Sequence, residues 1–301
     1  MKVTVFGGSG FLGSHVCDKL SEAGYRACIF DLKDSPWRSE GQEMIVGDML
    51  DEQAVAEAVE DAHAVFNFAG IADIEDANVR PKDTVRVNVL GNAIALDACV
   101  KAGVKRYVFA SSVYVYSKSG GFYRCSKQAC EQYIETYNEN YGLDYTILRY
   151  GSLYGPRADD NNAIRRFVKQ ALTEGRISYY GSPEALREYV HVEDAARSSV
   201  EILGPEYVNE RIVLTGHQPM RVGDLMKMIR EMLGRDVEFE WGTGGTAHYE
   251  ITPYSFSPKV GKKLAPPLHV DLGQGVLRVI EDVHREVRSD LDDHLGVLVS
   301  K

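Results

Sequence analysis

Residues 3–16 read "VTVFGGSGFLGSHV", an apolar β-branched run joined to an amphipathic run by three spaced glycines. The first run predicts a buried strand, and the second predicts a helix from about Phe11 to Ala23. Gly7, Gly10 and Gly13 occupy the turn between them, where a side chain would collide with a bound pyrophosphate or with the neighbouring strand. The helix N-terminus offers amide donors and a favourable dipole to the same anion. The pattern predicts a dinucleotide site, and the alternative is a tight turn without a ligand.

The acid that follows this turn indicates which dinucleotide binds. Asp31 ends the next strand-like run, "RACIFD", at about the distance from Gly13 that is typical of dinucleotide-binding folds. A carboxylate there accepts hydrogen bonds from both ribose hydroxyls of NAD and repels the 2′-phosphate of NADP, so we expect NAD as the cofactor. The nearby Lys33 and Arg38 weaken this selectivity. Asp48, after the third predicted strand, either binds the adenine amino group or only caps a turn.

Apolar and amphipathic runs alternate over the first half of the chain. Strands are expected at "EMIVG", "AVFNFAG", "KRYVFASS" and "DYTILRY", and helices from Glu52, over Pro81–Ala102 and over Tyr123–Asn140. This alternation predicts an α/β fold, a Rossmann-type doubly wound parallel sheet. Beyond Gly151 the chain is richer in Gly and Pro. We therefore predict an NAD-binding domain over residues 1–150 and a smaller C-terminal substrate-binding lobe over 151–301, with some segments returning to the main sheet.

Composition narrows the class of partner. The 301 residues are 44% hydrophobic and 26% charged, which is enough apolar material for a sizeable core. The formal net charge of −10 argues against nucleic-acid or membrane partners, whose binding surfaces need clustered Lys and Arg. No signal-peptide pattern precedes the first strand, so we expect a cytoplasmic protein. Five cysteines without metal-site spacing are interpreted as reduced packing residues, and no metal ion is expected: Cys17, Cys28, Cys99, Cys125 and Cys130.

Chemistry is predicted in the segment "SSVYVYSKSGGFYRCSK", residues 111–127. Tyr123 and Lys127 lie four residues apart on a predicted helix, so they share a face. An ammonium beside a phenol lowers the phenol pKa from about 10, which would make Tyr123 a general base. Ser112 ends a predicted strand, where an open parallel sheet binds its ligands, and its hydroxyl can hold the same substrate oxygen. The alternative is a surface helix pair without a catalytic role.

Several segments in this order carry a family resemblance: "GGSGFLG", "FNFAG", "VNVLGN", "FASSVYVY", "YRCSK", "LRYGSLYGPR" and "REYVHVEDAA". Over nearly its whole length the sequence resembles the extended short-chain dehydrogenase/reductase family, in its group of NAD-dependent nucleotide-sugar epimerases and dehydratases. The resemblance implies catalytic roles for Ser112, Tyr123 and Lys127, with Asn88 supporting the proton network, and a bound NAD regenerated in each turnover. The predicted cofactor contacts are Gly7, Gly10, Phe11, Leu12, Gly13, Asp31, Asp48, Met49, Phe68, Ala69, Gly70, Tyr123 and Lys127.

The residues after Ser112 bear on the reaction. Relatives that act as 4,6-dehydratases carry an Asp-Glu pair there, whereas this chain has Val113 and Tyr114. Decarboxylating relatives use a Glu in that neighbourhood, and epimerase-reductases use a Cys. Without these proton shuttles the resemblance favours epimerisation at sugar carbon 4 through a 4-keto intermediate. A dehydrogenase or reductase, a 4,6-dehydratase, and a catalytically idle NAD-binding scaffold remain alternatives.

The substrate implied is a nucleotide-diphosphate sugar. Arg187 and Arg157 are predicted to bind the diphosphate, Asn162 the base or phosphate, and Ser152 the sugar, at a position where relatives often have Asn. Arg165 and Arg166 are further candidates, and surface ion pairs are the alternative for both. The connection from Ser112 to Tyr123 is shorter than in relatives, so we expect a more open pocket or a lid from "WGTGGTAHYEITPYSF".

A homodimer through a four-helix interface is expected, because the two corresponding helices pair across subunits in relatives. The predicted apolar contacts are Val85, Val89, Ile94, Leu96, Tyr133, Ile134 and Tyr137.

Overall fold

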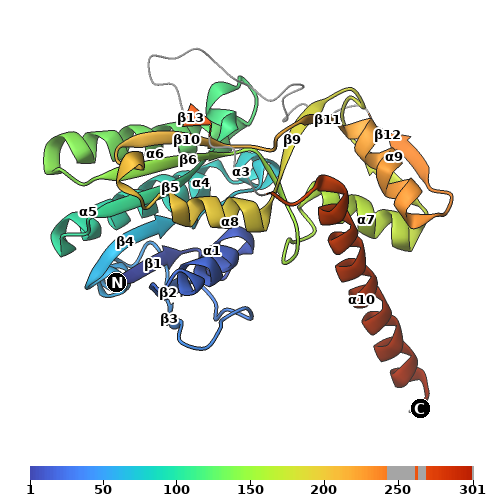
Figure 1. Cartoon of the computed structure of the whole chain (residues 1–301), viewed down its shortest axis with the longest axis horizontal. Helices are drawn as coiled ribbons and strands as arrows, with labels where there is room; N and C mark the ends of the chain where they lie inside the picture. The colour runs from blue at the N-terminus through green and yellow to red at the C-terminus, as the bar shows by residue number, and fades with distance from the viewer. Residues whose placement is uncertain (243–261, 264–268, 300–301) are drawn as a thin grey trace.

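The computed structural model describes residues 1–242, 262–263 and 269–299, with side chains described for residues 1–242 and 269–288. Its centre is a sheet in which every paired strand runs parallel to its neighbour. The strand order is β13-β10-β6-β5-β4-β1-β2-β3 (Figure 1). The bounds are β1 Lys2–Phe6, β2 Arg26–Asp31, β3 Glu43–Val46, β4 Ala62–Asn67, β5 Arg106–Ser112, β6 Tyr145–Tyr150, β10 Glu210–Leu214 and β13 Lys262–Lys263. The chain winds outward from β1 in both directions, which confirms the predicted doubly wound α/β fold.

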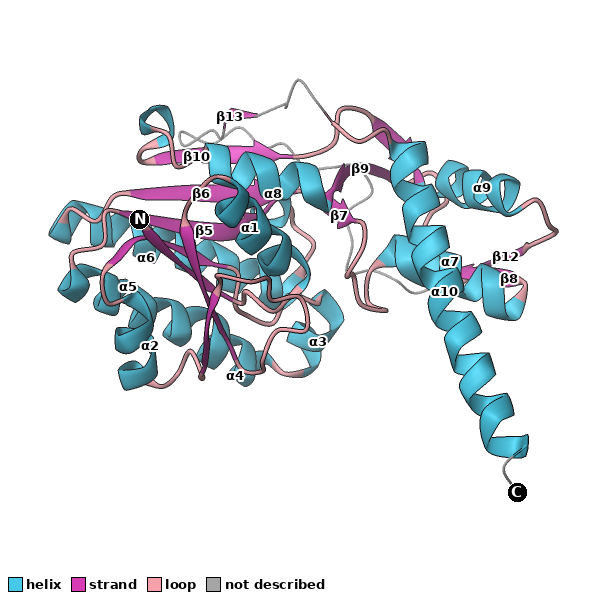
Figure 2. Cartoon of the chain, turned by 60° about the horizontal axis from the view of Figure 1, so that its bottom comes forward, coloured by secondary structure: helices cyan, strands magenta, loops and turns pink. Residues whose placement is uncertain are grey.

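Helices cover both faces of the sheet, as right-handed crossovers between parallel strands require (Figure 2). One face carries α1 (Phe11–Glu22) and α8 (Val192–Glu201), which pack against each other. The other carries α2 (Glu52–Val59), α5 (Gly91–Ala102) and α6 (Gly121–Tyr141). Each layer has its own apolar core, and the β-branched strand residues fill both because both faces are covered.

A smaller lobe extends from the main sheet after β6 (Figure 1). It contains a three-stranded sheet, a two-stranded sheet and three helices around a separate apolar core. The bounds are β7 Ser152–Tyr154, β9 Leu186–His191 and β11 Pro219–Arg221, then β8 Arg176–Tyr179 and β12 Glu238–Trp241, with α7 Ala163–Glu174, α9 Val222–Leu233 and α10 Leu272–Val299. Between these elements the chain returns to the main fold as α8 and β10, so the two halves interleave.

The helix predicted over Pro81–Ala102 is not regular. It consists of α4 (Pro81–Thr84), a π-helical segment (Val85–Leu90) and α5 (Gly91–Ala102). The wider π turn places Asn88, a buried polar residue, toward the loop after β4. π turns inside helices are frequent at functional sites, and Asn88 within this one hydrogen-bonds Ile71 in the segment after β4.

Two predictions of burial were wrong. Cys125 is exposed on α6, whereas the other four cysteines are buried. Leu96 and Ile134, proposed as dimer contacts, are 0% and 1% exposed and pack in their own core. Helical periodicity marks an apolar stripe but does not say whether the chain's own sheet or another subunit covers it.

Candidate active site

The glycine turn after β1 lies where the strand order reverses, between β1 and β4. Gly7 has φ +76°, and a Cβ on it would approach the Ala69 backbone nitrogen to 2.7 Å. A Cβ on Gly13 would overlap the Gly7 carbonyl oxygen. Only glycines let β1, α1 and the loop after β4 approach so closely, and this crevice is where doubly wound sheets bind dinucleotides.

The N-terminus of α1 is open to an anion. Its N-cap is Gly10, no side chain caps it, and its first turn holds no acid. The Asp31 carboxylate is held at the end of β2, where Oδ2 accepts the Ser9 amide at 3.0 Å and Oδ1 accepts the Leu32 amide at 2.8 Å. The turn after β1 thus offers amide donors for a pyrophosphate, and the end of the adjacent strand β2 offers a carboxylate for ribose hydroxyls. This arrangement fits NAD.

The other predicted cofactor residues lie around the same crevice. Asp48 is exposed, and its Oδ1 accepts the Leu50 amide at 2.9 Å, so it does cap a turn. Gly70 has φ +149° and faces the Asn88 amide. Met49 and Leu12 are buried, and Phe11, Phe68 and Ala69 are half-buried.

Tyr123 and Ser112 are joined by a side-chain hydrogen bond, although they come from different elements. Ser112 ends β5 and is 7% exposed. Its Oγ also accepts the Tyr114 amide at 3.3 Å and so caps the 3-10 turn Val113–Tyr116. A substrate hydroxyl placed between the Ser112 and Tyr123 oxygens could exchange a proton with either.

Lys127 lies beside this pair but does not lower the phenol pKa in the way predicted. Burial raises the pKa of Tyr123 to about 12, and the hydrogen bond to Ser112 only partly opposes it. The Lys127 ammonium donates to the Ala110 carbonyl at 2.7 Å and lies 5.7 Å from the centre of the Tyr123 ring. Burial lowers the pKa of Lys127 as well. In the protein alone, loss of hydration outweighs any attraction between the two groups.

Asn88 links three parts of the site. Its Oδ1 accepts the Ile71 amide at 2.7 Å, and its Nδ2 donates to the Ile71 carbonyl and to Ser126 Oγ, both at 3.0 Å. Ile71 follows the loop after β4, and Ser126 lies on α6 between Tyr123 and Lys127. Asn88 therefore joins α6, which carries Tyr123 and Lys127, to the segment after β4.

A buried ion pair beneath α6 was not predicted. Glu131 and Arg149 are buried and joined at 2.6 Å, and Ser111 Oγ donates to the same carboxylate at 2.5 Å. Arg149 also hydrogen-bonds Tyr116. The spacing of Lys127 and Glu131 on one helix face was a visible signal, but the partner on β6 was not. The pair joins α6 to the ends of β5 and β6.

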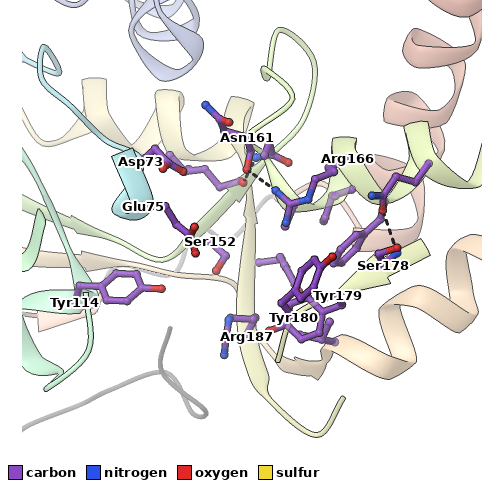
Figure 3. A pocket seen from close by; sticks show the side chains of 18 residues that line it. Asp73, Glu75, Tyr114, Ser152, Asn161, Arg166, Ser178, Tyr179, Tyr180 and Arg187 are labelled. Atoms are coloured by element: carbon purple, nitrogen blue, oxygen red, sulfur yellow. Dashed lines mark hydrogen bonds between the residues drawn. The ribbon is translucent and has the colours of Figure 1, made fainter. Parts of the chain in front are cut away.

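A cavity of about 510 Å³ lies between the main sheet and the smaller lobe (Figure 3). Ser152, Asn162, Arg166 and Arg187 line it, together with Tyr114, whose ring meets that of Tyr123 edge-on at 6.3 Å between centroids. Ser112 and Tyr123 do not line this cavity themselves, but Tyr114, which does, contacts Tyr123.

Asn162 and Arg187 are less free than the sequence suggests. The Asn162 Nδ2 donates to the Leu153 carbonyl at 2.8 Å, and its Oδ1 caps α7. Arg187 is 7% exposed, and one of its guanidinium nitrogens donates to the Leu186 carbonyl at 2.9 Å. Both still present atoms to the cavity.

Arg157 and Arg165 lie elsewhere and do not line the cavity. Arg157 pairs with Asp18 on α1 at 2.8 Å, and its guanidinium lies 5.0 Å from the centre of the Trp37 ring. Arg165 is occupied by Asp160, Asp282 and Glu286, so it joins α7 to α10. Sequence spacing could not reveal Asp18, Asp282 and Glu286, which are distant along the chain from the arginines they contact.

Two carboxylates that the sequence did not single out, Asp73 and Glu75, also line the cavity. They lie before and within the short helix α3 (Ile74–Val79), which belongs to no recognised motif. The proposed lid, "WGTGGTAHYEITPYSF", lies outside the described residues beyond Gly242. Among the described side chains, no three or more His, Cys, Asp or Glu residues are grouped to hold a metal ion. In the described part of the chain, no helix is both long and apolar enough to cross a bilayer.

The cofactor crevice and the Ser-Tyr-Lys arrangement agree with a comparison to known families. The sequence profile described as the NAD dependent epimerase/dehydratase family matches residues 3–213. The chain belongs to this family. The predicted resemblance is thereby confirmed, and the chain is an enzyme of the NAD dependent epimerase/dehydratase family, with NAD as cofactor.

Relatives within the NAD dependent epimerase/dehydratase family catalyse different reactions. A UDP-glucuronate 4-epimerase of Thermodesulfobacterium geofontis is 25% identical, over 92% of this chain and 94% of its own. A dTDP-glucose 4,6-dehydratase of Mycobacterium tuberculosis is 24% identical, over 96% of this chain and 95% of its own. A solved UDP-glucose 4-epimerase of Thermotoga maritima, with UDP-glucose, shares the fold with TM-score 0.82 and 24% identity, covering 95% of this chain and all of that one (100%).

Proposed function

We propose that this chain is an NAD-dependent nucleotide-sugar epimerase that inverts sugar carbon 4. The observation that carries the proposal is the Ser112–Tyr123 hydrogen bond beside Lys127, with no carboxylate at either position after Ser112. Val113 is 1% exposed and Tyr114 presents a ring to Tyr123. The catalytic group is thus one acid-base pair, which is what an epimerase needs.

The proton chemistry follows from that pair. Deprotonated Tyr123 Oη takes the proton of the C4 hydroxyl while Ser112 Oγ holds the same oxygen, and the C4–H bond breaks to leave a ketone. NAD supplies the hydride acceptor and, once reduced, the donor. After the keto sugar rotates, Tyr123 returns its proton to the oxygen as the new C4–H bond forms on the opposite face. Atoms and charge balance over the cycle, so no further acid or base is required.

The cavity supplies the substrate contacts in this proposal. Arg187 and Arg166 would hold the diphosphate, with Asn162 beside them, and Ser152 would contact the sugar. Tyr179 and Tyr180 line the same side as Arg166 and could stack on a nucleotide base (Figure 3). Arg157 is left out because it is engaged by Asp18 and Trp37.

The alternatives need different groups. A 4,6-dehydratase must also remove a proton from C5 and expel water from C6, and the position used for this in relatives is occupied by Tyr114. A one-way dehydrogenase or reductase is compatible with the same residues and differs in releasing the reduced cofactor. An idle scaffold would not need Tyr123 and Lys127, which are both present and adjacent.

Product analysis separates these functions. The nucleotide sugar that co-purifies with the protein would be identified by mass spectrometry, and the product of its turnover by NMR. A C4 epimer with no net change in NAD supports the proposal. A 4-keto-6-deoxy sugar, a stoichiometric change in NADH absorbance, or no turnover with bound NAD would instead establish dehydratase, dehydrogenase or scaffold.

A cytoplasmic homodimer active in carbohydrate biosynthesis is part of the same proposal. Five large apolar side chains are exposed on the π-helical segment and on α6: Val85, Leu90, Phe122, Tyr133 and Tyr141. Contact with a second copy would remove them from water. We also propose that residues 1–150 bind NAD and that residues 151–301 supply most substrate contacts.

A further inference from the structure

We propose that Glu75, with Asp73 behind it, makes this enzyme reject sugar acids and select sugars that present hydroxyl or amine donors. The inference rests on the proposed function, because it assigns the substrate class of that cavity.

Charge is divided between two sides of the cavity. Figure 3 shows Glu75 and Tyr114 on one side, near Ser152, and Arg166 with Tyr179 on the other. Among the described lining residues the cations are Arg166 and Arg187, and the anions are Asp73 and Glu75. No described cation lines the cavity next to the carboxylates in this view.

The two carboxylates differ in their freedom. Asp73 Oδ1 accepts the Asp76 amide at 2.8 Å and caps α3, so that carboxylate is fixed in place. Glu75 is exposed to the cavity and takes no hydrogen bond or ion pair from any residue that the structure describes. Its oxygens can therefore accept hydrogen bonds from a ligand without breaking an existing contact.

A short connection explains why α3 reaches this cavity. Only residues 113–120 separate Ser112 from the start of α6, and α6 packs directly against α3. Asn78 Oδ1 on α3 accepts the Phe122 amide at 3.1 Å, and a Cβ on Gly121 would overlap that same oxygen. Packed against the start of α6 in this way, α3 has its carboxylates Asp73 and Glu75 at the cavity.

The charge of the diphosphate determines which end of the substrate lies at which side of the cavity. A diphosphate is favoured beside Arg166 and Arg187, which leaves the sugar toward Ser152, Tyr114 and Glu75. A sugar carboxylate would there meet two like charges within a partly enclosed space that salt can still reach, since Glu75 is exposed. Neutral hydroxyls or a protonated amine would donate to the same oxygens.

Binding of matched ligands tests this inference. The NAD-containing protein would be titrated calorimetrically with UDP, UDP-glucose, UDP-glucosamine and UDP-glucuronate, which share one nucleotide. We expect UDP-glucuronate to bind at least ~10-fold more weakly than UDP-glucose at low salt. The gap should narrow to within ~3-fold in Glu75→Gln and in 0.5 M salt, because both remove the repulsion. Glu231→Gln, on the exposed face of α9, controls for loss of a remote carboxylate.

The outcomes separate this inference from the proposed function. Equal affinity for the glucose and glucuronate ligands, or a gap unchanged in Glu75→Gln, overturns the inference and leaves the epimerase proposal intact. Absence of binding by every UDP ligand overturns it together with the UDP-sugar form of the proposed function. A kcat loss of ~10²-fold in Glu75→Gln with the affinity ratio unmoved would assign the carboxylate to proton transfer and also overturn it.

Discussion

Tyr123 and Ser112 hold the reacting oxygen in the proposed mechanism, so removing one hydroxyl should separate catalysis from cofactor binding. We expect Tyr123→Phe to retain NAD and to lower kcat by at least ~10²-fold, because the phenyl ring still fills its place but accepts no proton. Bound NAD would be measured by absorbance after denaturation, and kcat from epimer formation. An unchanged rate would remove Tyr123 from its role.

The raised pKa of Tyr123 gives a pH dependence. Burial raises it to about 12, so the phenol is protonated at neutral pH and only a small fraction is the base. Below that pKa the phenolate fraction grows tenfold per pH unit, so log kcat/KM, which reports the enzyme before substrate binds, should rise with a slope near one between about pH 6 and 9. A profile that is flat over this range would show that bound ligands have already lowered the pKa below it.

Some residues of the site could be predicted from the sequence, and others could not. Tyr123, Lys127 and Ser112 were predictable because a helical spacing of four and a strand end place them together. Arg157 was not, because its partners Asp18 and Trp37 are far away in the sequence. Glu75 was missed because α3 belongs to no motif.

The broken helix around Asn88 can be tested by removing its amide. Asn88→Ala loses three hydrogen bonds inside the protein, so we expect the free energy of unfolding to fall by about 2 kcal/mol. Urea denaturation would measure it, with Asn140→Ala, exposed near the end of α6, as control. Equal stability of the two variants would mean that water replaces the amide without loss. The π turn itself was not predicted, and the groups that Asn88 contacts from it, Ile71 and Ser126, lie far from it along the chain.

The close approach of α1 to the glycine turn predicts the effect of one added methyl group. A Cβ on Gly13 would overlap the Gly7 carbonyl oxygen, so Gly13→Ala should push α1 away from β1 and cause loss of bound NAD on purification. In the control, Gly273→Ala, the nearest atoms are the Asp271 carboxylate at 3.1 Å and the end of Met232 at 3.5 Å, which can shift. Retention of NAD by Gly13→Ala would contradict the proposal that NAD binds at the glycine turn between β1 and α1.

The whole molecule presents exposed apolar side chains on the π-helical segment Val85–Leu90 and on α6. We expect a dimer in sedimentation at micromolar concentration, and a monomer after Val85→Glu with Tyr133→Glu, which are 56% and 48% exposed. Met232→Glu, 38% exposed on α9, should leave the dimer intact. A native monomer would refute the interface.

The overall arrangement was predictable to different degrees in its two halves. Alternating runs up to Tyr150 predicted the sheet because most of its strands are followed by a crossover helix, although β3 follows β2 without one. The smaller lobe was predicted only in outline, since its strands are short and pair with distant segments, such as β9 with both β7 and β11.

The position of β10 in the sequence, 60 residues or more after its partner β6, has a consequence for folding during synthesis. As the nascent chain leaves the ribosome, β6 emerges well before β10, which pairs with one of its edges. Until residue 214 has emerged, that edge of β6 has unpaired backbone amides and carbonyls beside the apolar residues Ile147 and Leu148. The early half of the protein thus depends on its later half for protection from self-association. A gene cut after codon 150 would encode an aggregation-prone fragment and not a free-standing nucleotide-binding unit.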